Sequence, residues 1–236
     1  MNPYVFPASR GIYNLVGLML RFGWDVAIDA GSVYSWSIDA RHLLAEKSIT
    51  LRKGGRESKA WATWDSADSV RPLINLSRVP ENLLYLCLNR SGELDRLLGS
   101  CHFRYPANVI RLPSSRFYSK DDQYHQSYIA PNGSENFTIA TEIKRWLRGP
   151  VPLLLTTSFN PGGEPPARSL ATAKDYAAHL GVRLVVYNPR ITEEERKGSF
   201  PAIRLNDDGT LQVVRAGGDI SDVINRLRKS GYKVLE

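Results

Sequence analysis

Cysteine is scarce in this sequence, which has Cys87 and Cys101 among its 236 residues. Two cysteines are too few for a disulfide framework, and neither lies in a Cys-x-x-Cys motif or at a spacing typical of metal ligands. We therefore expect a protein of the reducing cytoplasm that is stabilised by its apolar core. No metal site built from its side chains is expected.

Long apolar runs are also missing. The most apolar run near the N-terminus, residues 15–20, is too short to span a membrane and ends at Arg21. Arg10 alone supplies basic side-chain charge ahead of that run, unlike the charged start of a signal peptide. We expect neither a signal peptide nor a membrane anchor.

Acidic residues are fewer than basic ones, with 24 Asp and Glu against 31 Lys and Arg and a formal net charge of +7. This balance favours polyanionic partners such as RNA. The basic residues are scattered in pairs such as Arg52-Lys53, without a long run interleaved with aromatic residues. Ordinary solvated surface charge is therefore the alternative interpretation.

A chain of this length fits one large α/β domain, and we predict a single domain over residues 1–236. Apolar periodicity and capping residues predict helices that alternate with strands. Helices are expected over residues 10–22, 39–46, 138–147, 169–179 and 221–229, and strands over residues 26–28, 151–155, 182–187 and 211–214. Because the alternation lacks strict βαβ regularity, the predicted sheet is twisted and mixed.

Residues 114–136 are polar and aromatic, with Tyr118, Tyr124 and Tyr128 but no clear period. We predict that this segment is an insertion or a mobile loop.

The most informative segment of the sequence is residues 156–166, which follows five apolar residues, 151–155. Small hydroxyls, an amide and two glycines are therefore expected at the end of a buried strand. There, backbone N–H groups and short side chains are able to surround a phosphate or an acyl-adenylate without a bulky Cβ in the way. Taken alone, the segment also fits an ordinary turn rich in glycine and proline.

Four segments in the same order resemble the YrdC-like threonylcarbamoyl-AMP synthases. TSFNPGGEPPA (157–167) resembles the TSAN-(L/P)-SGEPP segment of that family, and DVAIDAGSVYSWSIDA (25–40) resembles its VAYPTDTVYGLGCDA. VIRLPSS (109–115) is similar to its VRVPDHP, and LNDDGTLQVVRAGGDISDVINRL (205–227) to its DL-x-DDG-x-LRVLRPGAVS-x-EEI ending. The resemblance implies a YrdC-like α/β fold, in which helices flank a sheet around a large basic cavity.

The resemblance also implies an activity, that of an L-threonylcarbamoyladenylate synthase, a nucleotidyltransferase. ATP, bicarbonate and L-threonine or a close analogue would give a carbamoyl-adenylate and pyrophosphate. A transferase partner protein would then pass the carbamoyl group to tRNA. ATP is a substrate in this reaction, and Mg²⁺ is expected to accompany its phosphates. Such chemistry depends on positioning and on anion binding, so no acid–base dyad is required.

Four residues match the positions that contact the nucleotide in the resembled family. Ser158 and Asn160 stand at its Ser-x-Asn pair, and Arg111 and Arg215 stand at the arginines of its R-x-P and R-P-G segments. The resemblance implies that these four bind ATP. An arginine fork suits bidentate phosphate binding, with a surface ion pair as the alternative for either arginine.

Five further residues match positions that hold substrate in the resembled family. Ser32 and Tyr34 stand at the second threonine and the tyrosine of PTDTVYG, which line its amino-acid pocket. The loop KGGRESK resembles its K-x-R-P-x-x-K-P, whose cations bind substrate anions. This implies that Lys53 and Arg56 are catalytic and that Lys59 belongs to the amino-acid site, with a solvated loop as the alternative.

The sequence also departs from the family pattern. The proline, first threonine, aspartate, second threonine and glycine of PTDTVYG are replaced here by Asp29, Ala30, Gly31, Ser32 and Ser35. A Ser-Thr pair ahead of the last strands is replaced by Pro201-Ala202. These changes alter the hydrogen bonding of the amino-acid pocket and of the nucleotide site.

Two alternative functions are also open, the first because of these departures and the second because of another resemblance. The first is a non-catalytic or repurposed YrdC-like protein that binds RNA or a nucleotide in the same basic cavity. The second is a protein related to the O-carbamoyltransferases, because TTSFNPGGEP resembles their NTSFN-x-x-GEP segment.

Overall fold

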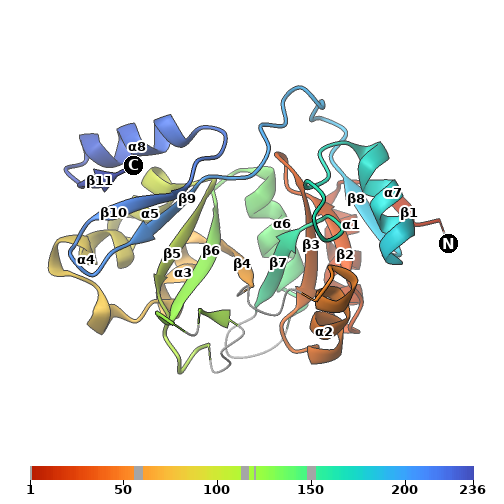
Figure 1. The fold of residues 1–236 in the computed structure, drawn as a ribbon, viewed down its shortest axis with the longest axis horizontal. Coiled ribbons are helices and arrows are strands. Elements are labelled where there is room, and N and C mark those ends of the chain that lie inside the picture. Colours follow the sequence, from red (N-terminus) through yellow and green to blue (C-terminus); the bar gives the residue numbers. More distant parts are fainter. Residues whose placement is uncertain (1, 56–60, 113–116, 120, 148–152) are drawn as a thin grey trace. The chain divides into compact units, whose positions relative to one another are not determined.

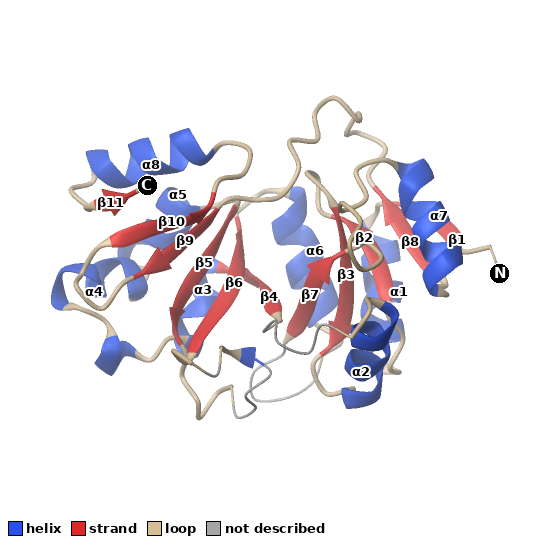
Figure 2. Cartoon of the chain, in the orientation of Figure 1, coloured by secondary structure: helices blue, strands red, loops and turns tan. Residues whose placement is uncertain are grey.

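The computed structural model describes residues 2–55, 61–112, 117–119, 121–147 and 153–236 (Figure 1). The chain groups into two compact units. The first unit contains Met1–Ser58 and Thr138–Ser199, and the second contains Lys59–Phe137 and Phe200–Glu236. Helices and strands alternate in both units (Figure 2), and both contain parallel and antiparallel strand pairs. The predicted mixed α/β class is therefore confirmed.

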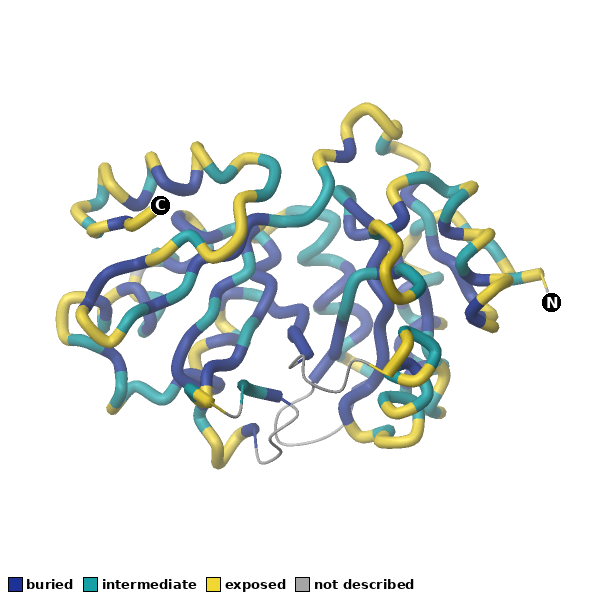
Figure 3. The backbone as a smooth tube through the Cα atoms, in the orientation of Figure 1, coloured by how far each residue is buried: buried dark blue, intermediate teal, exposed yellow. Residues whose placement is uncertain are grey.

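The sheet of the first unit runs in the order β1, β8, β2, β3, β7. Its strands are β1 (Tyr4–Pro7), β2 (Val26–Asp29), β3 (Tyr34–Asp39), β7 (Leu154–Ser158) and β8 (Leu184–Tyr187). β8 pairs in parallel with β1 and β2, whereas β3 pairs antiparallel with β2 and β7. Both β2 and β3 are buried along their whole length (Figure 3).

Strand β3 corrects one sequence prediction. A helix was expected over residues 39–46, but the chain forms the strand Tyr34–Asp39 and then helix α2 (Leu43–Arg52). Trp36 and Ile38 are fully buried, while serines occupy the alternate positions of the strand. Because serine has little preference for strands, the sequence pattern concealed an element that burial on both faces stabilises.

Capping residues fix two further helices of the first unit close to the ranges that were predicted for them. Helix α1 (Arg10–Arg21) begins at Ser9, whose side chain accepts a hydrogen bond from the Ile12 N–H at 3.3 Å. Helix α7 (Leu170–Leu180) begins at Ser169 and ends at Gly181, which has a left-handed φ of 70°. Helix α6 (Glu135–Lys144) begins and ends three residues before the predicted range of 138–147.

Gly17 on α1 lies against the segment around α6, and its substitution should destabilise the fold. A Cβ at this position would lie 2.7 Å from Trp146 Cδ1 and 2.9 Å from the Ile143 carbonyl oxygen. Overpacking of this kind costs about 1–3 kcal/mol, so we expect Gly17→Ala to lower the free energy of unfolding in urea by that amount. Gly11→Ala on the same helix meets no atom within 4 Å and serves as the matched control. Equal stability of the two variants would contradict the packing described here.

The sheet of the second unit runs in the order β4, β6, β5, β9, β10, β11. Its strands are β4 (Ala62–Ser66), β5 (Cys101–Pro106), β6 (Tyr124–Ala130), β9 (Ala202–Leu205), β10 (Leu211–Arg215) and β11 (Val234–Leu235). Its helices are α3 (Ala67–Val70), α4 (Glu81–Cys87), α5 (Glu93–Leu98) and α8 (Ile220–Lys229), with short 3-10 turns at Arg71–Leu73, Leu76–Arg78 and Arg90–Gly92. Helix α3 contacts β4 and β6, and α5 contacts β5 and β6.

Strand β6 corrects a second prediction, because it lies inside the segment 114–136 that was expected to be an insertion or a mobile loop. Its residues 126–130 pair in parallel with β4, and its residues 124–129 pair antiparallel with β5. Its buried positions include His125 and Ser127, which an apolar pattern does not reveal. The strand was missed because polar side chains occupy core positions.

A closed hydrogen-bond network makes those buried positions tolerable. The Thr63 hydroxyl lies 2.9 Å from His125 Nε2 and 2.6 Å from Ser127 Oγ, and Ser127 Oγ lies 2.7 Å from the Tyr105 hydroxyl. Burial lowers the pKa of His125 to about 4, so its ring is neutral near pH 7. Buried polar groups that satisfy one another in this way are compatible with a strand in the core.

No helix among the described residues is both long enough and apolar enough to cross a membrane.

Candidate functional site

The predicted nucleotide-binding segment begins in strand β7 and continues into the turn that follows this strand. Ser158, the last residue of β7, pairs with Ser35 of β3. The Ser158 hydroxyl donates to Asn160 Oδ1 at 2.7 Å. Asn160 Nδ2 in turn donates to the carbonyls of Pro161 and Glu164 at 2.9 and 2.7 Å. Asn160 therefore closes the turn that follows the strand, and it holds the two predicted nucleotide-binding residues together.

Lys53 extends from the C-terminal end of α2 to the same place. Its ammonium donates to the Ser158 carbonyl oxygen, to Ser158 Oγ at 3.4 Å, to Thr157 Oγ1 at 3.3 Å and to Asn160 Oδ1 at 3.2 Å. Each of these acceptors is a neutral oxygen atom. The structure thus brings a predicted catalytic cation to the strand end where the hydroxyl and amide groups lie.

Gly162 packs directly on the backbone of Lys53. A Cβ at Gly162 would collide with the Lys53 carbonyl oxygen and lie 3.1 Å from its carbonyl carbon. The glycine therefore permits a close approach of the turn to the end of α2.

The hairpin between β2 and β3 carries the predicted amino-acid-binding residues Ser32 and Tyr34. The Tyr34 N–H donates to the Ala167 carbonyl at 2.9 Å, and the Phe159 N–H donates to the Tyr34 carbonyl at 3.0 Å. The Ala167 N–H donates to the Phe159 carbonyl at 2.9 Å. The first two backbone bonds tie the hairpin to the segment around Ser158, and the third closes that segment on itself.

Tyr34 is fully buried and Ser32 is half-buried. Burial raises the pKa of Tyr34 well above its usual value, and the nearby Asp29 carboxylate adds to this effect. The Tyr34 hydroxyl is therefore neutral over the physiological range and can donate a hydrogen bond.

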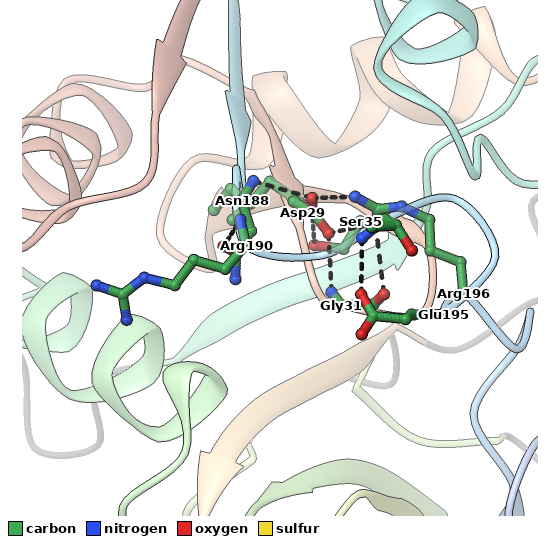
Figure 4. A network of polar contacts seen from close by, with 9 residues as sticks. Asp29, Gly31, Ser35, Asn188, Arg190, Glu195 and Arg196 are labelled. Atoms are coloured by element: carbon green, nitrogen blue, oxygen red, sulfur yellow. Dashed lines mark hydrogen bonds and ion pairs between the residues drawn. The ribbon is translucent and has the colours of Figure 1, made fainter.

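The sequence analysis missed an ion pair beside this hairpin (Figure 4). Arg196 Nη1 donates to Asp29 Oδ1 and Arg196 Nη2 to Asp29 Oδ2, each at 2.6 Å. The side chains of both residues are almost completely buried, at 3% and 1% exposure. Arg196 belongs to the charged segment 192–198, whose composition is typical of a loop. A lone aspartate in the buried run VAID was the available signal, since a buried carboxylate needs a partner.

Arg111 and Arg215, the other predicted nucleotide-binding residues, belong to the second unit. Both are exposed. The Arg111 N–H donates to the Asn108 carbonyl at 3.0 Å within a turn. Arg215 ends β10, and its Nε donates to the Phe200 carbonyl at 2.8 Å. Their role in nucleotide binding stays a prediction.

Arg56 and Lys59 lie outside the residues that the structure describes. Among the predicted site residues of the first unit, the structure therefore brings together Lys53, Ser158 and Asn160. The hairpin with Ser32 and Tyr34 is hydrogen-bonded to the same segment.

Cys87 and Cys101 are both buried and free, and burial raises the pKa of each thiol to about 12. No cluster of three or more His, Cys, Asp or Glu side chains suited to a metal ion occurs in the part of the chain that the structure covers.

Comparison with known proteins gives a clear result for the fold. No family model matches the sequence, and no curated protein matches it. Among solved structures, E. coli YciO superposes with a TM-score of 0.68 over 92% of this chain and 96% of its own, at 16% identity. P. abyssi Sua5 complexed with L-threonine superposes with a TM-score of 0.67 over 98% of this chain, at 15% identity. The chain has the YrdC-like fold.

The YrdC-like fold is also found as part of larger proteins. This chain spans 62% of that Sua5 chain and 65% of a second P. abyssi Sua5 structure. Full-length HypF in the phosphate- and nucleotide-bound form matches 87% of this chain over 24% of its own, with a TM-score of 0.62 and 16% identity. The superpositions establish the YrdC-like fold. At identities this low, the activity has to be argued from the residues of the site. The large basic cavity expected of this fold stays a prediction.

Proposed function

We propose that this protein forms a carbamoyl-adenylate from ATP, bicarbonate and an amino acid, threonine or a close analogue, and releases pyrophosphate. The observation that carries the proposal is the convergence of the Lys53 ammonium with Ser158 and Asn160 at the end of β7. A cation, a hydroxyl and an amide at one strand end suit a phosphate-bearing substrate.

The reaction needs few special groups. The amino nitrogen condenses with bicarbonate, with loss of water, to give a carbamate. A carbamate oxygen then attacks the α-phosphorus of ATP while the bond to the bridging β-phosphate oxygen breaks, and pyrophosphate leaves with that electron pair. Negative charge accumulates on the phosphate oxygens during this step, and Lys53 stabilises it. Ser158 and Asn160 orient the nucleotide.

Proteins with the same fold support the choice of substrates. P. abyssi Sua5 has been solved in complex with L-threonine, and HypF in a phosphate- and nucleotide-bound form. By analogy, the Ser32 and Tyr34 hairpin is proposed to hold the amino acid next to the nucleotide. We propose further that Mg²⁺ enters with ATP, bound mainly by phosphate oxygens and water. The threonylcarbamoyl group, or its analogue with another amino acid, is proposed to pass to tRNA with the help of a transferase partner.

The proposal is tested by pyrophosphate release from ATP with Mg²⁺ and bicarbonate, screened across the amino acids. Release should require bicarbonate and one amino acid, and Ser158→Ala should lower it about tenfold or more, because a group that orients the nucleotide is lost. Ser48→Ala, on α2 outside the site, is the matched control and should match the wild type. Nucleotide or RNA binding without pyrophosphate release would contradict the proposal and favour a binding protein.

A further inference from the structure

Asp29 shapes the hairpin that carries Ser32 and Tyr34. It ends β2 and lies directly opposite Tyr34 in the strand register. Four donors occupy its two oxygens. Asp29 Oδ1 accepts from the Gly31 N–H at 2.9 Å and from Arg196 Nη1 at 2.6 Å. Asp29 Oδ2 accepts from the Asn188 N–H at 3.0 Å and from Arg196 Nη2 at 2.6 Å. A carboxylate saturated in this way acts by holding its neighbours in place.

Arg196 approaches the hairpin from the segment between β8 and β9. Besides its two bonds to Asp29, its guanidinium lies 3.4 Å from the Gly31 carbonyl oxygen and 5.2 Å from the centre of the Tyr34 ring. The Arg196 carbonyl accepts a hydrogen bond from Arg168. The arginine is thus fixed at both its backbone and its side chain, and it touches both ends of the turn between the strands.

The buried ion pair between Asp29 and Arg196 is not expected to add much to the stability of the fold. Bringing both charges out of water carries a large desolvation cost, and apolar residues of similar volume often stabilise such a site better. In addition, Arg196 Nε is buried and has no hydrogen-bond partner among the described residues. Buried donors without acceptors are unfavourable. An unfavourable local arrangement that the surrounding fold retains points to a role at a functional site.

The hairpin is hydrogen-bonded directly to the turn that contains Asn160. The Tyr34 backbone is bonded to both Phe159 and Ala167, the two sides of the turn that contains Asn160. The next residue along β3, Ser35, pairs with Ser158. A shift of the hairpin would therefore change the placement of Ser32 and Tyr34 relative to the nucleotide-binding turn.

We propose that Arg196 is a positioning residue for the amino-acid substrate, which acts through Asp29 to fix Ser32 and Tyr34 beside the turn that contains Ser158. This inference rests on the proposed function. It assigns a role to Asp29 and Arg196, to neither of which the sequence resemblance gave one.

The test compares Arg196→Met with Arg190→Met, a nearby arginine that is exposed and points away from Asp29 (Figure 4). In the pyrophosphate-release assay, Arg196→Met should raise the KM for the amino acid about tenfold and leave the KM for ATP within about twofold, because displaced groups bind their ligand less well. Arg196→Lys should lie between it and the wild type, since lysine keeps the charge and loses the fork. Arg190→Met should match the wild type.

Hydrogen exchange of the amides in residues 30–36 provides a readout that does not depend on activity. Exchange there should become faster in Arg196→Met and stay unchanged in Arg190→Met. If Arg196→Met does not fold, Asp29→Asn, which keeps the shape of the side chain, serves in its place. An unchanged KM for the amino acid in an active Arg196→Met would contradict this inference alone. A wild-type protein that releases no pyrophosphate with any amino acid would overturn the proposed function, and the positioning role with it.

Discussion

Lys53→Ala is expected to release pyrophosphate about a hundredfold more slowly than the wild type, because it removes the cation that stabilises charge developing on the phosphates. The ammonium of Lys53 lies among the Ser158 carbonyl and hydroxyl and the Asn160 amide oxygen. Alanine would remove this cation from beside these oxygens. The loss should appear in kcat as well as in KM for ATP, since the charge increases in the transition state.

The matched control for this variant is Lys47→Ala, which removes an exposed lysine from the same helix. It changes the net charge by the same amount, so any general effect of charge on the approach of ATP should be equal in the two variants. Lys53→Arg keeps the charge and should recover part of the rate. Equal activity of Lys53→Ala and Lys47→Ala would contradict this role. It would show that Lys53 only stabilises the turn after Ser158 and does not take part in the reaction.

Gly162→Ala should lower the rate of pyrophosphate release about tenfold to a hundredfold, and the free energy of unfolding by about 1–3 kcal/mol. The added Cβ would collide with the Lys53 carbonyl oxygen, and neither backbone segment can make room without moving. Either the turn or the end of α2 must therefore shift, which separates Lys53 from Ser158. Displacements of about 1 Å in a site of this kind cost up to about a hundredfold in rate.

Gly163→Ala is the comparison that isolates this collision. Gly163 has a left-handed φ of 90°, but a Cβ there would meet no atom within 4 Å. Its substitution should therefore cost backbone strain, about 1 kcal/mol in the free energy of unfolding, with a smaller loss of activity. The account would be wrong if Gly163→Ala lost more activity than Gly162→Ala while both variants remained folded.

Elements with local signals could be predicted from the sequence. Helices α1 and α7 begin at Ser9 and Ser169, whose side chains accept hydrogen bonds from the first turn, as serine caps do. Strands β3 and β6 had no such signal, because serine and histidine occupy buried positions in them. Those positions depend on partners far away in the sequence, such as Thr63 for His125. Sequence periodicity contains no information about partners of this kind.

The residues of the candidate site also fall into those that local motifs reveal and those that they do not. The resemblance of short motifs was enough to select Lys53, Ser158 and Asn160, and the structure brings these three together. The Asp29 and Arg196 pair could not be located from the sequence, because 167 positions separate its members and Arg196 lies in a charged segment typical of surface loops. Long-range ion pairs are determined by the fold, and local patterns do not reveal them.

The most direct test of the central claim is the mass of the product formed from ATP, the active amino acid and carbon-13-labelled bicarbonate. We expect an adenylate that contains the amino acid and the labelled carbon, formed in equal amount to pyrophosphate. An adenylate without the label would show that the amino acid is activated through its own carboxylate. The absence of any adenylate, with ATP still bound, would contradict carbamoyl-adenylate synthesis by this protein.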